Sequence, residues 1–282
     1  MNLHYIFWTE YYMPIWNKDL HTETELITAE EADKNNAFFT VKWEDSGEVI
    51  PFQKNAIYMK VQYPGLLTGL GYTHESGLGE KKAKEIKLGI SLDPVTGLPY
   101  LPGSAVKGLL RTPFLENPSY ILACLGRDPE ELDLAYGLEA QIFGKKHPWD
   151  KKMGLPTKDF PQGGDVFLDA YPVAANRDGR LLGLDNLTPH RPRHPEGLKN
   201  PIPLSFLKLV PDVVLQFRFR LAKSVVGDTE ITPEEKLALF TTILEDLGAG
   251  AKTNTGFGLL EQTEAPKTVC TYLIPSTPKA PK

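Results

Sequence analysis

Cysteine is scarce in this chain. Only two occur among 282 residues, Cys124 and Cys270, and they lie far apart with no CxxC pattern. A disulfide framework or a structural zinc site needs more thiols at closer spacing. The cysteine content therefore favours a reducing compartment, and we expect the protein in the cytoplasm.

Long hydrophobic segments are lacking as well. No run approaches the roughly 18 apolar residues of a membrane-spanning helix. The first sixteen residues mix aromatic and polar side chains and have no basic start, so they do not read as a signal peptide. We expect no membrane association.

Recognisable catalytic motifs are few. No Gly-x-Ser-x-Gly elbow and no Cys–His pair at a known spacing occurs. Lys252-Thr253 resembles the end of a Walker A loop, but Ala251 stands where that motif has glycine. The expected order is also helix, loop, strand, whereas a phosphate-binding P-loop runs strand, loop, helix. We predict no nucleotide hydrolysis and no cofactor.

The histidines and aspartates give no metal site. His190 and His194 have helical ligand spacing, but the prolines between residues 189 and 195 prevent a helix, and the neighbouring arginines repel a cation. Spacing alone gathers no cluster from the aspartates that follow strand-like segments, namely Asp93, Asp165 and Asp169.

One candidate general base remains. His74 lies in a glycine-rich loop beside Glu75, so acid–base cleavage of RNA is conceivable. A single loop histidine is more often a polar contact. We keep endoribonuclease activity through His74 or Glu75 as the alternative to a non-catalytic role.

The net charge of −5 is unusual for a protein that binds nucleic acid, but it is unevenly distributed. Residues 1–50 contain ten acidic residues against three lysines, whereas residues 171–223 contain nine basic residues against four acidic ones. The acidity is concentrated at one end, which leaves basic surfaces elsewhere.

Hydrophobic patterns and capping residues predict an α+β fold. Strands are expected over 56–63, before a turn at Asp93-Pro94, over 164–172, in two runs within 204–222 and around 257–262. Helices are expected after an N-cap at Ser104, ending at Pro113, over about 130–143, and from Thr232 to Leu247. The order suits a ferredoxin-like core with insertions.

Two segments could bind phosphate. The run GAGAKTNTGFG, residues 248–258, has closely spaced glycines whose amides can approach an anion, with Lys252 adding charge. In the run SAVKGLLR, Lys107 and Arg111 lie four residues apart and so on one helix face, near Ser104. A tight turn and a solvated basic edge are the simpler interpretations of these two segments.

Residues 172–203 form a long excursion that shows no core pattern, and loops of that length are usually functional. Within it, Arg191 and Arg193 alternate with proline and histidine, as in an extended arm that stacks on unpaired bases.

These segments, in this order, resemble the RAMP (repeat-associated) proteins of CRISPR systems. PYLPGSAVKGLLR is similar to the first-helix signature of that family, and GAGAKTNTGFG to its C-terminal glycine-rich loop. QIFG, GDVFLDAYP, the LTPH string and NPIPLSFLKL resemble the single-copy branch that closes the backbone filament of the type III-B Cmr effector complex. The match covers roughly residues 60–262.

The resemblance implies an RRM-related domain that binds guide RNA along its phosphates. Together with composition, it leads us to expect three parts: an acidic extension packed on the core (1–55), the RAMP domain (56–263) with a thumb insertion (172–203), and a flexible tail (264–282). The implied partners are guide and target RNA, the repeated backbone subunit, a neighbouring RAMP cap subunit and a small helical subunit.

The resemblance also selects the RNA-binding residues. They are Ser104, Lys107 and Arg111 on the helix, with Gly248, Gly250, Lys252, Thr253, Asn254, Gly256 and Gly258 on the loop. His74, Arg191 and Arg193 complete the set of RNA-binding candidates. Target cleavage in such complexes relies on an aspartate in the loop after the first strand of the repeated subunit. Here residues 64–79 contain His74 and Glu75 but no aspartate, which favours a non-catalytic subunit; a generic single-stranded RNA-binding protein is the remaining alternative.

Overall fold

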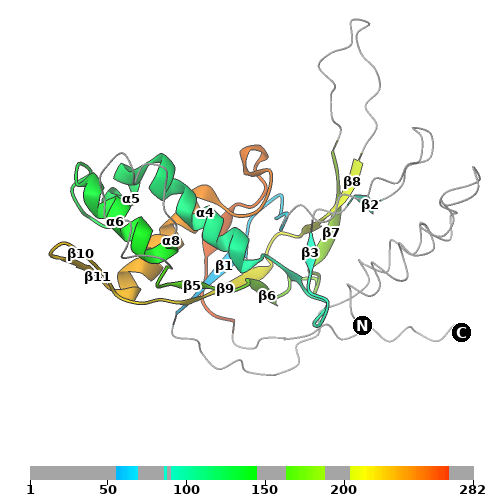
Figure 1. Cartoon of the computed structure of the whole chain (residues 1–282). Helices are drawn as coiled ribbons and strands as arrows, with labels where there is room; N and C mark the ends of the chain where they lie inside the picture. Colours follow the sequence, from blue (N-terminus) through cyan, green and yellow to red (C-terminus); the bar gives the residue numbers. More distant parts are fainter. Residues whose placement is uncertain (1–54, 69–85, 88–89, 145–162, 188–203, 267–282) are drawn as a thin grey trace, which may run out of the picture.

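A computed structural model describes residues 55–68, 86–87, 90–144, 163–187 and 204–266. Its main sheet is antiparallel, and its strand order is β12-β1-β9, with two further strands on the other side of β9 (Figure 1). The strands are β1 (Ala56–Val61), β5 (Val166–Phe167), β6 (Tyr171–Ala174), β9 (Val214–Arg220) and β12 (Leu260–Gln262).

The connections make this a ferredoxin-like arrangement. A helical segment follows β1, a second helix joins β9 to β12, and the last strand lies beside the first. The prediction of an α+β fold is therefore confirmed. The helices are α4 (Gly103–Glu116), α5 (Pro118–Cys124), α6 (Leu132–Phe143) and α8 (Pro233–Leu247).

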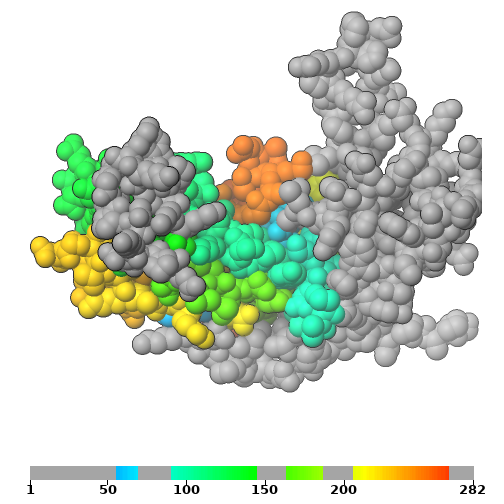
Figure 2. All heavy atoms as spheres, in the orientation of Figure 1, coloured from blue at the N-terminus to red at the C-terminus, as the bar shows by residue number. Residues whose placement is uncertain are grey.

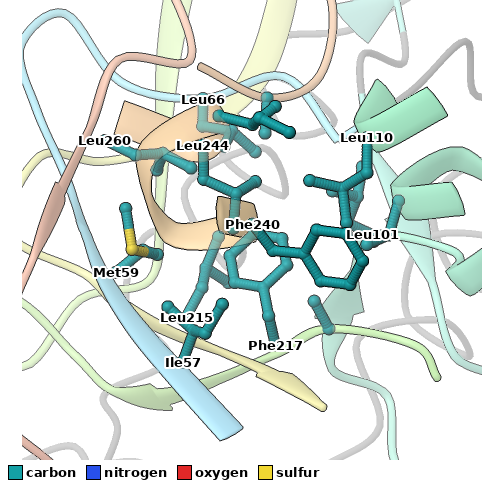
Figure 3. Packing of buried hydrophobic residues seen from close by; sticks show 14 of the residues in the cluster. Ile57, Met59, Leu66, Leu101, Leu110, Leu215, Phe217, Phe240, Leu244 and Leu260 are labelled. Carbon is teal, nitrogen blue, oxygen red and sulfur yellow. The ribbon is translucent and has the colours of Figure 1, made fainter. Parts of the chain in front are cut away.

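Alternation along the strands decides which face of the sheet the helices cover. Ile57, Met59 and Val61 of β1 are buried, whereas the residues between them are partly exposed. In β9, Phe217 and Phe219 are buried, with Arg218 and Arg220 on the other side, as their spacing predicts. Figure 3 shows the core that results between this face and the helices.

A separate three-stranded sheet precedes β9 in the chain. β8 (Leu204–Leu209) pairs with β2 (Ile86–Lys87) and β7 (Leu182–Leu187), and it continues through Asp212 into β9, so the two predicted strands around Pro211-Asp212 are confirmed. Two hairpins complete the described structure, β3 (Ser91–Leu92) with β4 (Pro99–Tyr100) and β10 (Ser224–Val226) with β11 (Thr229–Ile231).

The long excursion was read wrongly in its first half. Most of β6 and all of β7 lie within residues 172–203, and Val173, Leu181 and Leu182 are buried. The pattern is hard to see because the two strands are short and separated by a turn at Asn176–Gly179. Residues 188–203, with Arg191 and Arg193, lie outside the described residues.

Two other sequence predictions need correction at α4. The helix begins at Gly103 after Pro102, whose side chain makes no capping bond, so Ser104 is not the N-cap. The helix also continues through Pro113 to Glu116. Burial of Pro113 and Phe114 in the core offsets the lost amide bond.

The predicted strand over 164–172 divides into β5 and β6. Phe167 faces the helices and packs against the rings of Phe143, Phe219 and Phe240. Its neighbours Val166 and Leu168 are exposed, whereas Phe167 is partly buried against the core.

The end of α6 at Phe143 and the N-cap of α8 at Thr232 are as predicted. Gly144 follows α6 with a left-handed φ of 72°. At the start of α8, Thr232 and Glu235 form a capping box: the Glu235 amide donates to Thr232 Oγ1 at 3.2 Å, and the Thr232 amide donates to Glu235 Oε2 at 2.8 Å.

One buried ion pair fixes α8 to the sheet. Lys236 Nζ donates to Asp165 Oδ2 at 2.7 Å and to the carbonyl of Ala222 at 2.6 Å, while the Ala222 amide donates to Asp165 Oδ1 at 2.7 Å. Both charged side chains are at most 1% exposed. Burial lowers the pKa of Lys236, and the bond to Asp165 opposes that shift.

Candidate nucleic-acid interface

The glycine-rich loop, residues 248–258, lies at the end of the main sheet where β1 finishes and β12 begins. Its amides bond to the chain that leaves β1: Ala251 N–H donates to the Leu67 carbonyl at 3.0 Å, and Gly258 N–H donates to the Gly65 carbonyl at 2.8 Å. Both arms of the loop are thus fixed to residues 65–67. The predicted order of helix, loop and strand is confirmed, with α8 before the loop and β12 after it.

Three glycines of the loop cannot be replaced without moving the backbone. A Cβ on Gly250 would lie 2.1 Å from the Leu67 carbonyl oxygen, and one on Gly258 would lie 1.9 Å from that of Ala249. Gly248 is similarly close to Gly258, and all three have φ between 68° and 83°. The glycines therefore serve a close backbone approach, as well as any ligand.

A small apolar cluster holds the C-terminal arm of the loop. The Phe257 ring packs edge-on against Phe206 of β8 at 5.9 Å between centroids, and Leu67 completes the cluster. Lys208 Nζ lies 5.6 Å from the centre of the Phe257 ring and pairs with Asp185 of β7 at 2.6 Å. The loop is in this way packed between the β1 exit and the β7–β8 sheet.

The tip of the loop is open to solvent. Lys252 is exposed with a φ of 61°, a conformation that non-glycine residues adopt at a cost, and it precedes a short 3₁₀ turn, η2 (Thr253–Thr255). Within the described part of the chain, the backbone amides of Lys252, Thr253 and Asn254 donate to no other group, and no carboxylate pairs with Lys252. Neighbouring unpaired amides beside a cation can bind a phosphate.

The three predicted RNA-binding residues of α4 differ in their contacts and exposure. Arg111 forms an ion pair with Glu139 of α6, and their side chains are 15% and 4% exposed. This geometry favours a structural role for Arg111. Lys107 Nζ lies 5.9 Å from the centre of the Phe167 ring, and Ser104 is exposed.

Sequence reasoning missed a carboxylate at the start of α4. Asp169 Oδ1 accepts a hydrogen bond from the Gly103 amide at 2.6 Å. The positive end of the helix therefore already has an anionic partner, so Ser104 and Lys107 are what α4 can offer an RNA. Figure 2 shows the surfaces of the α4 segment (teal) and the glycine-rich loop (orange) on one face of the molecule.

The aspartates weighed as metal ligands are all engaged elsewhere. Tyr171 Oη donates to Asp93 Oδ2 at 2.6 Å; burial raises the pKa of Asp93, but this bond and those from two backbone amides lower it overall. Asp165 pairs with Lys236, and Asp169 with the start of α4. Among the described residues, no three His, Cys, Asp or Glu side chains come together as a metal site.

His74 and Glu75, the candidates for catalysis, lie outside the described residues, as do Arg191 and Arg193. Tyr63 was not predicted. It lies two residues after the end of β1 and is 82% exposed. An aromatic residue before Pro-Gly at a strand end was the available signal.

The fold and the loop agree with a family match. The model of the RAMP superfamily matches residues 58–261, and the chain belongs to that superfamily. It is 30% identical over 225 residues to the CRISPR system Cmr subunit Cmr6 of Pyrococcus furiosus, covering 65% of this chain and 63% of the relative. It is 29% identical over 174 residues to Cmr6 of Saccharolobus solfataricus, covering 61% and 48%. The chain thus spans less than two thirds of either relative.

Solved structures give weaker similarities. A chain in a cryo-EM structure of the type III-B Cmr-beta complex bound to cognate target RNA matches with a TM-score of 0.48 and 21% identity, covering 77% of this chain and 60% of that one. The crystal structure of Cmr6 from Pyrococcus furiosus gives a TM-score of 0.38 and 20% identity, covering 76% and 100%. Separately, the described helices include none long and apolar enough to cross a membrane.

Proposed function

We propose that this chain is a non-catalytic RNA-binding subunit of a type III-B CRISPR Cmr ribonucleoprotein. It binds the guide RNA backbone towards the 3′ end and helps to position target RNA. Its partners in this proposal are the repeated backbone subunit, a neighbouring RAMP cap subunit and a small helical subunit. Membership of the RAMP superfamily and the similarity to two Cmr6 proteins support the assignment.

The observation that carries the RNA-binding role is the open tip of the glycine-rich loop. Amides of residues 252–254 and the exposed Lys252 side chain are held in place by the bonds of the two arms to residues 65–67. Amides and lysine bind phosphate without regard to base identity. That suits a guide-binding subunit, because the guide's bases must stay free to pair with a target.

The path beyond the loop includes the α4 segment on the same face of the molecule, with Ser104 and Lys107 as its candidate contacts. Gly248, Gly250, Gly256 and Gly258 act by shaping the loop. Arg191 and Arg193 remain candidates in the thumb segment, and the acidic residues 1–50 account for the net charge, so they need not oppose RNA at the loop.

The test is RNA binding by the full chain across a salt series, with a guide-length single-stranded RNA. Lys252→Ala removes one phosphate contact, so the slope of log affinity against log salt should fall by about 0.7. Lys223→Ala is the matched control. It removes the same charge from β10–β11, where Lys223 pairs with Glu230 at 2.6 Å, and should leave the slope unchanged.

Equal effects of the two variants would show a diffuse attraction and contradict binding at the loop. The same samples incubated with a divalent metal ion should leave the RNA intact. Cleavage that disappears in His74→Ala or Glu75→Ala would instead make the chain an endoribonuclease. Co-purification of the chain with other Cmr subunits separates the proposal from a generic RNA-binding protein, which would not assemble with them.

A further inference from the structure

Tyr63 is an exposed aromatic ring on a fixed stretch of backbone. Its side chain is 82% exposed, the most of any aromatic residue among the large exposed hydrophobic side chains in the described ranges. The backbone on each side of it is bonded to the arm that leaves the glycine-rich loop: Gln62 N–H donates to the Leu259 carbonyl at 2.9 Å, and Gly258 N–H donates to the Gly65 carbonyl at 2.8 Å. The ring is therefore held beside the loop without being buried by it.

The backbone that carries Tyr63 lies close to the proposed phosphate-binding tip of the loop. The next residue, Pro64, has its Cδ 3.8 Å from the position of a Cβ on Gly256, which directly follows the η2 turn. A 3₁₀ turn rises about 2 Å per residue, so residues 253–256 span only about 6 Å. A nucleotide whose phosphate lies at the tip can thus bring its own or a neighbouring base to Tyr63.

The residues around Tyr63 favour a nucleobase, and not an apolar protein surface, as the group that its ring contacts. The exposed residues at the tip are polar, namely Lys252, Asn254 and Thr255, and the exposed apolar residue on the adjoining arm, Leu259, is 42% exposed against 82% for Tyr63. Protein contacts are usually built around contiguous apolar cores, whereas an unpaired base needs a single flat ring beside backbone contacts. Tyrosine loses little side-chain entropy on such contact because it has only two rotatable bonds.

We propose that Tyr63 is a stacking platform for an unpaired base of the RNA held by the glycine-rich loop. The inference rests on the proposed RNA-binding function and adds a base-contacting subsite to it. Stacking tolerates any base, so the subsite is compatible with guides of every sequence. It would hold one base out of the paired region beside the loop.

The experiment compares two RNA ligands of equal length with the full chain, an ordinary single strand and an abasic sugar–phosphate strand. Tyr63→Leu should weaken binding of the ordinary RNA by about tenfold and leave the abasic strand unchanged. Tyr63→Phe keeps the ring and should bind both as the unmodified protein does. A 2-aminopurine base in the RNA should lose fluorescence on binding to the tyrosine and phenylalanine proteins, but not to the leucine variant.

Other outcomes separate the two proposals. If Tyr63→Leu weakens both strands equally, or neither, while salt-sensitive binding through Lys252 persists, the stacking role is wrong and the RNA-binding role stands. If Tyr63→Leu leaves RNA affinity unchanged but prevents assembly with the other subunits, the ring contacts protein and the inference is overturned. If the unmodified chain shows no salt-sensitive binding of either strand, the RNA-binding function fails, and the subsite fails with it.

Discussion

The lysines near the two ends of α8 lie in opposite environments, one buried and one exposed. Near the start of the helix, Lys236 is 1% exposed and is enclosed by Asp165 and the Ala222 carbonyl. Beyond its end, Lys252 is exposed on a loop whose arms are firmly bonded but whose tip is not. One end is a closed polar cluster that fixes the helix to the sheet; the other is a positive site open to a ligand.

The contrast between Lys236 and Lys252 shows how to separate lysines and arginines that stabilise the fold from those that can bind a ligand. A buried charge must have its partner inside the fold, because leaving it unpaired is costly. Arg111 follows Lys236 in this respect, with Glu139 as its partner. An exposed lysine on a preformed loop needs no internal partner, so its charge remains available to RNA.

The largest expected effect is at the closed end. Lys236→Ala leaves the Asp165 carboxylate buried without its partner and should lower the free energy of unfolding by about 3–5 kcal/mol. Denaturant titration measures it. The double variant Lys236→Met/Asp165→Leu should recover most of the lost stability, because neither charge is then buried alone. A double variant no more stable than Lys236→Ala would show that the ion pair does more than offset the cost of burying its two charges.

Gly258→Ala should damage the loop itself. The added Cβ would meet the Ala249 carbonyl, and φ is 77°, so a loss of about 3 kcal/mol in stability and weaker RNA binding are expected. Gly108→Ala is the control. Gly108 lies in α4 with no atom near its Cβ position, and the change should stabilise by up to about 1 kcal/mol. Similar stabilities for the two variants would contradict the packing described for the loop.

Arg111→Ala sharpens the comparison between structural and binding cations. It removes the cation of the ion pair with the buried Glu139, so the free energy of unfolding should fall by about 2–3 kcal/mol. Below the unfolding transition, the salt slope of RNA binding should stay as in the unmodified chain. A reduced slope with unchanged stability would move Arg111 back to the RNA surface.

The smallest effect concerns the capping box at the closed end of α8. Hydrogen bonds from the amide and the hydroxyl of Thr232 lower the pKa of Glu235 from its ordinary value of 4.5. Its contribution to stability is therefore present above that value and is lost as the pH falls through the lower folded pKa. Because the carboxylate is well exposed, Glu235→Gln should flatten the loss of stability on acidification by less than about 1 kcal/mol. Glu234→Gln removes a carboxylate outside the box and is the control; an effect as large as that of Glu235→Gln would contradict the role of the box.

Much of the fold was predictable because local signals agreed with it. Strand alternation in β1 and β9, the Thr232 cap and the glycine after Phe143 all depend on neighbouring residues, and the structure confirms them. The errors arose where distant residues decide. Pro113 stays within α4 because the core accepts it, and Ser104 is not the N-cap of that helix, whose first amide donates to Asp169.

In the candidate site, too, local sequence predicted some features, whereas others depend on distant residues. The glycine-rich loop could be recognised from its own composition. The partner of Arg111 is 28 residues away and that of Gly103 is 66 residues away, so neither could be seen in the local pattern. Exposure of Tyr63 likewise depends on how the chain leaves β1 and meets residues 258–259.

Site-specific crosslinking tests the central claim most directly. A photoreactive amino acid would replace exposed Asn254 at the loop tip in one protein and exposed Val225 of the distant β10–β11 hairpin in another (Figure 1). Each protein would be assembled with RNA at moderate salt and irradiated. RNA crosslinked through position 254 and not through position 225 is the result expected if the glycine-rich loop binds the RNA backbone. Crosslinking through position 225 alone would contradict it.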